Sequence, residues 1–383
     1  MSLLTTNTAL VGRVTIAVDA MGGDFAPQAA VIAALESLKK NEALGIILVG
    51  NQNVLEALLH LESDKGNAES LDSSTLSEGG FSPSASTSLS SDYQALYTTF
   101  RNDGRLVIHH APEVVLMSDR PSRALRKKQN SSMAVALQLV RDGVAGGCVS
   151  AGNTGALMLL GRSMLGMCPG IDRPAITKKL PSPKGSCYVL DLGANVDSTA
   201  EHLYQFSLMG SILVEAMEGV DRPRVALINV GEEEIKGSEQ VRLASRMLAE
   251  CKGVNYVGYI EGGDLFNGVA DVVVCDGFVG NVALKTGEGV AKLLHQSILQ
   301  VFDGHWYTRL LGKLMMPLFK RLLKSIDPSR HNGALFIGLQ GVVVKSHGNA
   351  DAKAFSYAIV QAVEEVERKI PDMINSRLDE LLF

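Results

Sequence analysis

Short, uninterrupted apolar runs alternate with helix-like segments along most of the chain, and this alternation constrains the fold more than any other feature. Continuous apolar runs are typical of strands that are covered on both faces. The runs lie at Val14–Ala20, Ile46–Val49, Leu106–His109, Cys148–Ser150, Tyr188–Leu192, Val225–Val230, Tyr256–Ile260, Val272–Cys275 and Val342–Lys345. Helices are predicted from Pro27 onward and at Ser131–Leu139, Thr154–Leu165, Ala200–Glu218, Lys236–Cys251, Asn281–Phe302 and Ala352–Lys369. The pattern predicts an α/β fold with a doubly wound, largely parallel sheet and helices on both faces.

Composition narrows the class of protein. Apolar residues make up 46% of the 383 residues and charged residues 20%, which excludes a disordered chain. The formal net charge of −5 gives no whole-molecule attraction to nucleic acid. The five cysteines form no Cys-x-x-Cys pair, residues 1–13 lack the pattern of a signal peptide, and no apolar run could span a bilayer. We therefore expect a cytoplasmic protein.

The length allows one large α/β domain or two coupled lobes. We expect a single catalytic domain over residues 14–371, with an N-terminal extension at 1–13 and a C-terminal helix or tail at 372–383. A serine-rich insertion at residues 63–103 has few core-sized side chains, which predicts a disordered surface segment. It is either a tolerated loop or a segment for partner binding or modification.

Six glycine-bearing loops follow the apolar runs. Glycine lets backbone N–H groups approach a ligand, and the carboxyl ends of parallel strands meet at one edge of a sheet. The loops therefore predict a composite site for a phosphate or an oxyanion, although tight turns between strands and helices would give the same pattern. The candidate residues are Gly22, Gly23, Asp24, Gly152, Asn153, Thr154, Gly155, Asn195, Gly277, Gly280 and His347.

The sequence lacks the motifs of several common enzyme classes. The chain lacks G-x-x-x-x-G-K-[ST], a G-x-G-x-x-G behind the first strand and a G-x-S-x-G elbow. Each cysteine lies in or beside an apolar run, and His109 and His110 point to opposite faces of a strand, so neither a nucleophile nor a metal site is indicated. These absences favour a reaction whose nucleophile arrives with the substrate, and phosphate itself qualifies.

The loop sequences resemble a known family. The stretches that carry the resemblance are Ala17–Asp24 with Ala26-Pro27, Arg126–Lys128 followed by Ser131–Met133, Ser150–Met158, Gly170–Ala175, Asp191–Asp197 and Asp276–Lys285. Together they are similar to the phosphate acyltransferases of bacterial phospholipid synthesis. The resemblance covers nearly all of residues 14–62 and 104–365. It departs from the family at the serine-rich insertion, at the N-terminal extension and at Asn332-Gly333-Ala334, where a double glycine is usual.

The resemblance implies transfer of a fatty acyl group from acyl carrier protein to inorganic phosphate, without a metal or other cofactor. It also implies a homodimer with a fold similar to that of isocitrate and isopropylmalate dehydrogenases and of phosphotransacetylase. Two other enzyme classes stay open: a short-chain phosphotransacetylase that uses coenzyme A, and a metal- and nicotinamide-dependent dehydrogenase. A non-catalytic scaffold that collects acyl carrier protein at a membrane is a further alternative.

Two residues in the family-like loops are the expected catalytic residues. Lys236 is predicted to head a helix and to hold the phosphate, and Asn281 to start another and to donate to the thioester oxyanion. The alternatives are a solvated lysine and a plain helix cap. His347 is a candidate proton donor to the leaving thiolate or a structural histidine.

Two basic segments predict partners. Arg123, Arg126, Lys127 and Lys128 form a dense cluster that would attract the acidic carrier protein, or else face water or bind an anion within the site. Residues 305–325 predict a basic amphipathic helix in a protrusion at 303–327, bent or divided at Pro317. We expect Trp306, Leu311, Leu314 and Leu318 to contact an anionic membrane surface peripherally, and packing in a dimer interface is the alternative.

Overall fold

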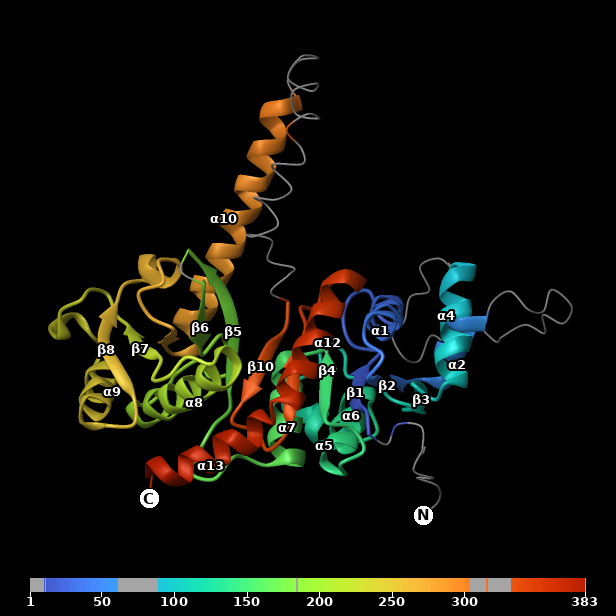
Figure 1. Cartoon of the computed structure of the whole chain (residues 1–383), viewed down its shortest axis with the longest axis horizontal. Coiled ribbons are helices and arrows are strands. Elements are labelled where there is room, and N and C mark those ends of the chain that lie inside the picture. The colour runs from blue at the N-terminus through green and yellow to red at the C-terminus, as the bar shows by residue number, and fades with distance from the viewer. Residues whose placement is uncertain are drawn as a thin grey trace, which may run out of the picture. The chain divides into compact units, whose positions relative to one another are not determined.

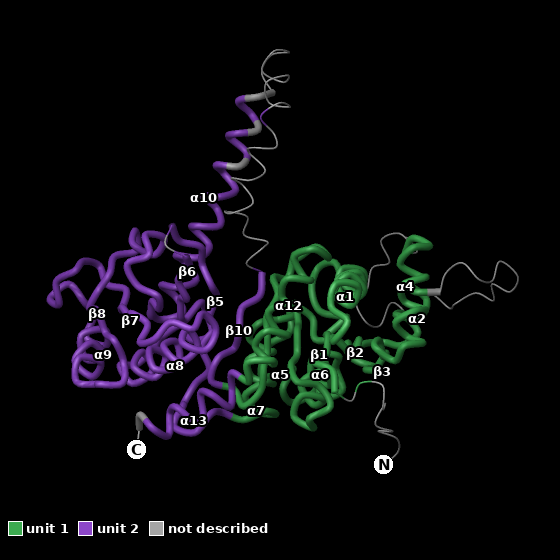
Figure 2. Tube along the Cα trace, in the orientation of Figure 1, with its two compact units in different colours: residues 1–166, 339–369 green, residues 167–338, 370–383 purple. Residues whose placement is uncertain are grey.

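The computed structural model describes residues 12–60, 89–183, 185–303 and 332–382, together with Leu10 and Met315. The chain divides into two compact units, which Figure 2 shows in different colours. The first unit contains residues 1–166 and 339–369, and the second contains residues 167–338 and 370–383. The expectation of a single catalytic domain over residues 14–371 stays a prediction.

The first unit is a parallel sheet in the strand order β3-β2-β1-β4-β11. Its strands are β1 (Val14–Asp19), β2 (Leu44–Gly50), β3 (Leu106–His110), β4 (Gly147–Ser150) and β11 (Val342–Lys345). Its helices are α1 (Gln28–Lys40), α2 (Gln52–His60), α4 (Ser91–Asn102), α5 (Pro121–Lys127), α6 (Ser132–Arg141), α7 (Thr154–Leu165) and α12 (Ala352–Glu367). Helices α1 and α12 pack together, as do α6 and α7, and the sheet lies between the two pairs (Figure 1).

The second unit is a mixed sheet in the order β10-β5-β6-β9-β7-β8, in which only β5 pairs antiparallel with its neighbours. Its strands are β5 (Ala175–Ser182), β6 (Gly185–Leu190), β7 (Arg224–Ile228), β8 (Asn255–Ile260), β9 (Val272–Val274) and β10 (Ala334–Ile337). Its helices are α8 (Ala200–Glu218), α9 (Glu239–Glu250), α10 (Gly277–Asp303) and α13 (Ile370–Leu382), with short 3₁₀ turns at Glu234–Lys236 and Gly262–Phe266. The expected C-terminal helix or tail is thus the helix α13.

The predicted α/β class and the largely parallel sheet are confirmed. Every predicted strand is present, with ends that differ by a few residues. Two strands, β5 and β10, were not predicted from the sequence. Strand β5 was missed because Lys178 and Lys179 interrupt its apolar pattern, yet Lys178 is buried in the structure and pairs with Glu288 of α10. Only tertiary packing supplies the partner that lets a lysine occupy such a position.

Part of the serine-rich insertion is ordered. Residues 91–102 form α4, where Tyr97 and Phe100 are buried, and the Arg105 guanidinium lies 5.0 Å from the centre of the Phe100 ring. The prediction of a disordered segment over residues 63–103 is therefore wrong for residues 91–102. Two aromatic side chains supply the buried surface that the serine content concealed. Residues 61–88 lie outside the described residues.

Strand register brings polar side chains to one level at the carboxyl ends of the first sheet. Asp19 at the end of β1 pairs in register with Ser150 at the end of β4, and Ser150 pairs with Lys345 at the end of β11. In the second unit, Leu190 at the end of β6 pairs with Val274 at the end of β9. The loops that follow these strands are the glycine-bearing loops of the sequence.

Helix α10 runs well beyond the strands of its own unit (Figure 1). The predicted amphipathic helix at 305–325 and nearly all of the protrusion at 303–327, including Trp306, Leu311, Leu314 and Leu318, lie outside the described residues. Among the helices that the structure does describe, none combines the length and the apolar character needed to cross a bilayer.

Candidate functional site

In the first unit, the loops after β1, β4 and β11 gather around the carboxylate of Asp19, which is fully buried. Ser150 Oγ donates to Asp19 Oδ2 at 2.6 Å, and the N–H of Met21 donates to Asp19 Oδ1 at 3.3 Å. Burial raises the pKa of Asp19, while hydrogen bonds from Ser132 and Ser150 act in the opposite direction. Asp19 was not among the candidate residues, although it ends the first predicted strand.

Close packing around Asp19 explains several of the predicted glycines. A Cβ atom on Gly22 would lie 2.6 Å from Asp19 Oδ2 and 2.8 Å from the backbone nitrogen of Gly152. Gly23 has a φ of +103°, and a Cβ there would lie 3.0 Å from the carbonyl oxygen of Gly348. The N–H of Asp24 donates to that same oxygen at 2.7 Å. The structure thus brings the first, second and last glycine loops of this unit together, and His347 is next to Gly348 in the chain.

Backbone donors remain open where α7 begins. Asn153 caps this helix, because its Oδ1 accepts the N–H of Ala156 at 3.0 Å. Within the described residues, the N–H groups of Thr154 and Gly155 make no hydrogen bond. These two groups point out of the first helical turn, as expected of an oxyanion or phosphate site. This arrangement agrees with the sequence expectation for both residues, whose roles stay predictions.

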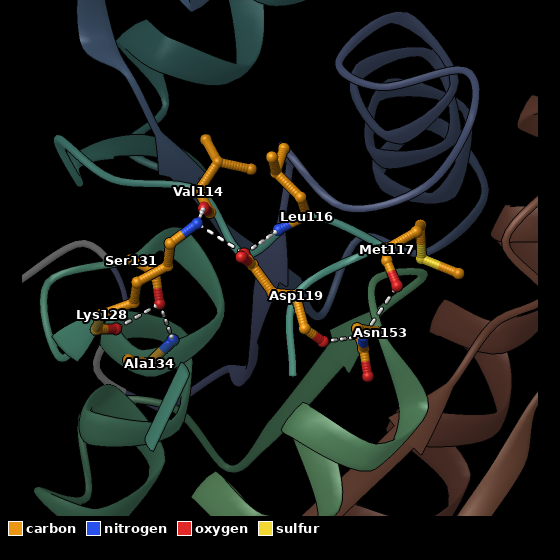
Figure 3. A network of polar contacts seen from close by, with 8 residues as sticks. All are labelled: Val114, Leu116, Met117, Asp119, Lys128, Ser131, Ala134 and Asn153. Atoms are coloured by element: carbon orange, nitrogen blue, oxygen red, sulfur yellow. Dashed lines mark hydrogen bonds and ion pairs between the residues drawn. The ribbon is translucent and has the colours of Figure 1, made fainter. Parts of the chain in front are cut away.

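The side chain of Asn153 is occupied by protein contacts. Its Nδ2 donates to the carbonyl oxygens of Met117 and Asp119, both at 3.0 Å (Figure 3). Its Oδ1 already accepts from Ala156. The Asn153 amide therefore joins the loop after β3 to the start of α7, and its donors are not available to a ligand in this arrangement.

Lys128 belongs to the same network (Figure 3). Its Nζ lies 2.5 Å from Asp119 Oδ2 and donates to the Val114 carbonyl at 2.7 Å. Burial alone would raise the pKa of Asp119, but the ammonium of Lys128 and the N–H of Leu116 hold it below its ordinary value. Lys128 is thus partly buried and committed to an ion pair, unlike the three other members of the predicted basic cluster. Arg123, Arg126 and Lys127 are exposed on α5.

In the second unit, the carboxylate of Asp191 organises the loop after β6. Oδ1 accepts the N–H groups of Ile176, Gly193 and Ala194 at 2.9, 3.2 and 3.0 Å. Oδ2 accepts the N–H of Asn195 at 2.7 Å and its side-chain Nδ2 at 2.9 Å. Burial raises the pKa of Asp191, and the surrounding N–H donors oppose that shift. The loop N–H groups that suggested an anion site are therefore turned inward to a protein carboxylate.

The first turn of α10 packs directly on this loop. A Cβ on Gly277 would lie 2.4 Å from the Asn195 carbonyl oxygen, and a Cβ on Gly280 would lie 1.9 Å from that of Asp191. The N–H of Gly277 donates to Asn195 O at 2.8 Å. Gly277 and Gly280 are needed for this close approach, and Asn195 is 4% exposed with both amide hydrogens engaged, to Pro174 O and Asp191 Oδ2. The Asn195 side chain therefore has no free donor to offer a ligand.

Neither of the two expected catalytic residues, Lys236 and Asn281, begins a helix as the sequence predicted. Lys236 does not head a helix: it ends a 3₁₀ turn, and α9 begins at Glu239 after the cap residue Ser238. Asn281 does not start α10, which begins four residues earlier at Gly277 under a cap from Asp276. The cap of α9, Ser238, thus lies two residues after Lys236, whereas the cap of α10, Asp276, lies five residues before Asn281.

Lys236 is held by an ion pair, whereas the amide of Asn281 has no partner in the described residues. Lys236 Nζ lies 2.6 Å from Glu233 Oε2, and that carboxylate raises the pKa of the lysine. Asn281 is exposed, and a Cβ built on Gly193 would lie 3.6 Å from the Asn281 Cβ. No hydrogen bond to the Asn281 amide occurs within the described residues. The amide is therefore open to a ligand beside the Asp191 loop.

Four of the five cysteines are too deeply buried to supply a nucleophile. Cys148, Cys168, Cys187 and Cys275 are buried. Burial raises the pKa of the Cys168 and Cys187 thiols to about 12, so the thiolate form is scarce at neutral pH. No cluster of three metal-ligating side chains occurs in the part of the chain that the structure describes.

Known proteins resemble this chain over most of its length. The sequence profile of a family described as "Fatty acid synthesis protein" matches residues 14–76 and 87–373. A phosphate acyltransferase of Marinobacter nauticus is 56% identical over 370 residues, which cover 97% of this chain and 97% of the relative. A phosphate acyltransferase of Ectopseudomonas mendocina is 47% identical over 96% of this chain and 98% of its own.

Solved structures share the fold at low sequence identity. A phosphotransacetylase from Streptococcus pyogenes superimposes with a TM-score of 0.52 at 14% identity, covering 96% of this chain and 99% of that one. A branched-chain phosphotransacylase from Enterococcus faecalis gives a TM-score of 0.50 at 14% identity over 92% and 99% of the two chains. These matches confirm the predicted similarity to the phosphotransacetylase fold.

Two glycines of α10 give a matched test of the packing around Asp191. Gly280→Ala should destabilise the protein by about 3 kcal/mol or more, because the new Cβ overlaps the Asp191 carbonyl. Gly289→Ala should stabilise it by about 0.5–1 kcal/mol, because nothing lies within 4 Å of its Cβ position and alanine favours a helix. Urea unfolding of both variants measures the difference. Equal stability of the two would contradict the packing described here.

Proposed function

The chain belongs to the phosphate acyltransferase family, and we propose that it transfers a long-chain fatty acyl group from acyl carrier protein to inorganic phosphate. Family membership over nearly the whole chain carries this proposal. Features of the two units, each taken by itself, are consistent with it in two ways. The four buried cysteines offer no ready thiolate. Open N–H groups at the start of α7 and an open amide at Asn281 are donors suited to phosphate and carbonyl oxygens.

The chemistry balances without a further reactant. An oxygen of hydrogen phosphate attacks the thioester carbonyl carbon, and a tetrahedral oxyanion forms. The carbon–sulfur bond then breaks, which gives acyl phosphate and the carrier thiolate, and the thiolate takes up the proton released by the phosphate. The protein's contribution is to hold phosphate against the carbonyl and to stabilise the oxyanion.

We assign roles to residues on this basis. Asn281 donates its amide to the thioester oxyanion, and Lys236 attracts the phosphate. In the first unit, the N–H groups of Thr154 and Gly155 bind phosphate or oxyanion oxygens, next to the loop of Gly22, Gly23 and Asp24. His347 stays a candidate proton donor to the leaving thiolate.

The carrier protein is proposed to dock on α5. Arg123, Arg126 and Lys127 are exposed there and would face the acidic carrier. Lys128, also in the predicted cluster, acts in this arrangement through its ion pair with Asp119, which holds the end of α5 in place.

We further propose that the protein is a cytoplasmic homodimer that attaches peripherally to anionic membranes through residues 305–325. The homodimer rests on the family resemblance, and membrane attachment rests on the sequence pattern of residues 305–325, which lie outside the described residues except for Met315. The acyl phosphate product is lipid-like, so release beside a membrane would suit its use by a membrane-bound acceptor enzyme.

The catalytic assignments are tested by phosphate-dependent release of carrier thiol. The wild type should act on palmitoyl carrier protein in preference to acetyl-coenzyme A, which a short-chain phosphotransacetylase would prefer. Asn281→Ala should lower kcat by about 10²–10³, as expected for loss of one oxyanion donor. Lys236→Ala should mainly raise the KM for phosphate. Turnover within threefold of the wild type in both variants would refute these roles.

The docking proposal is tested by reversing charge on α5. Arg126→Glu combined with Lys127→Glu should raise the KM for acyl carrier protein several-fold at low salt and weaken its salt dependence. Lys39→Glu with Lys40→Glu, at the end of α1, makes the same change in net charge on another exposed helix end of the unit and serves as the control. If both double variants shift KM equally, a specific docking role for α5 is wrong.

Membrane attachment is tested by sedimentation with anionic vesicles. Replacing Leu311, Leu314 and Leu318 by glutamate should abolish sedimentation, because the apolar contacts are lost, and should leave soluble-substrate activity intact. A wild-type protein that ignores the vesicles, or a triple variant that becomes monomeric, would favour the dimer interface instead.

A further inference from the structure

Two lysines and one glutamate gather on α10 and β5 in the second unit. Lys178 Nζ lies 3.3 Å from Glu288 Oε1, and Lys285 Nζ lies 2.8 Å from Glu288 Oε2. One carboxylate thus faces two ammonium groups, and these three side chains together carry one net positive charge. None of them was among the site residues expected from the sequence.

The two lysines differ in how far their side chains are exposed to solvent. The Lys178 side chain is 4% exposed, and burial lowers its pKa, so its charge depends on a close counter-ion. Glu288 supplies that counter-ion. The Lys285 side chain is 54% exposed, which leaves its ammonium accessible from solvent while it contacts the same carboxylate.

Helix geometry places Lys285 next to Asn281. The two residues are four apart on the exposed side of α10, so their Cβ atoms are about 5–6 Å from one another. The Lys285 ammonium contacts Glu288, three residues further along α10, while its long, half-exposed side chain begins one turn from Asn281. An anion that contacts the Asn281 amide would lie within reach of this ammonium.

The backbone around Asn281 offers few competing donors. The N–H groups of residues 193–195 all donate to Asp191. In the first turn of α10, the N–H groups of Gly277, Val279 and Gly280 are also engaged, to Asn195 O, Asp276 Oδ1 and Asp276 O. Side chains must therefore provide most of the binding to an anion here.

We propose that the Lys285 ammonium binds an oxygen of the phosphate beside the Asn281 amide, which faces the thioester oxyanion; the family resemblance assigns Lys285 no such role. This inference rests on the proposed function for its place in the reaction. Lys236, by contrast, lies on another loop and pairs with Glu233, and no hydrogen bond or ion pair joins it to Asn281 in the described residues. Lys285, in contrast, shares a helix face with the proposed oxyanion donor, one turn away from it.

The test uses the full-length protein and a matched pair of variants. Lys285→Met should raise the KM for inorganic phosphate about tenfold or more, with a smaller change in kcat, and Lys285→Arg should restore most of the affinity. Lys292→Met is the control, because Lys292 is exposed on the same helix two turns further on. Calorimetric titration with inorganic phosphate, without acyl donor, should show the same loss of affinity in Lys285→Met.

Each outcome has a distinct meaning. Unchanged phosphate affinity together with an unchanged KM for acyl carrier protein in Lys285→Met, or an equal loss in Lys292→Met, would overturn the proposal. Failure of Lys285→Arg to recover affinity would also overturn it, since a retained cation is what the site requires. The phosphodiester of the carrier's prosthetic arm has the same chemistry as the ligand. A rise in KM for acyl carrier protein with no change in phosphate titration would assign the site to that source.

The proposed reaction and the proposed phosphate site are tested by separate measurements. If the wild type shows no phosphate-dependent release of carrier thiol, the function is wrong, whereas the phosphate titration still decides whether Lys285 binds the anion. Circular dichroism and urea unfolding of each variant identify any loss of folded protein before affinities are compared.

Discussion

The carboxylate of Asp191 holds the candidate site of the second unit in shape. It accepts five hydrogen bonds, four from backbone N–H groups and one from the Asn195 amide. A loop folded around one carboxylate in this way is rigid, and the first turn of α10 can then pack on it closely enough that only glycine fits at residues 277 and 280. The position of Asn281 follows from that contact, because it lies on the same turn.

The first unit also has a buried carboxylate at the end of a strand, but the loops around it leave some N–H groups without a partner among the described residues. Asp19, buried at the end of β1, accepts hydrogen bonds from Ser150 and from the N–H of Met21, and the following glycine loops pack around it. Here, however, the N–H groups of Thr154 and Gly155 stay open. Backbone donors are thus available for an anion in the first unit, whereas in the second unit the donors come largely from side chains.

The backbone and side-chain donors matter for the proposed reaction, because the protein does not supply the nucleophile itself. Buried cysteines with raised pKa values agree with the proposed reaction, in which the incoming phosphate is the nucleophile. Donors that are fixed before the substrate arrives need no reorganisation when negative charge develops on the carbonyl oxygen, which is the largest single advantage such a site can offer. The ion pair of Lys128 and Asp119 and the contacts of Asn153 fix the loop after β3 in the same sense.

The sequence by itself determined the order and type of most elements, because continuous apolar runs separated by helical patterns permit few folds other than a doubly wound sheet. It also located the glycine loops, since glycine is required wherever backbone segments approach this closely. Tertiary structure decided what those loops do. Whether a loop N–H faces a ligand or a buried carboxylate depends on the fold of the loop, as the three N–H groups that turn to Asp191 show. The same holds for charge: Lys178 and Lys128 look like surface lysines in the sequence, and only the fold supplies Glu288 and Asp119 as their partners.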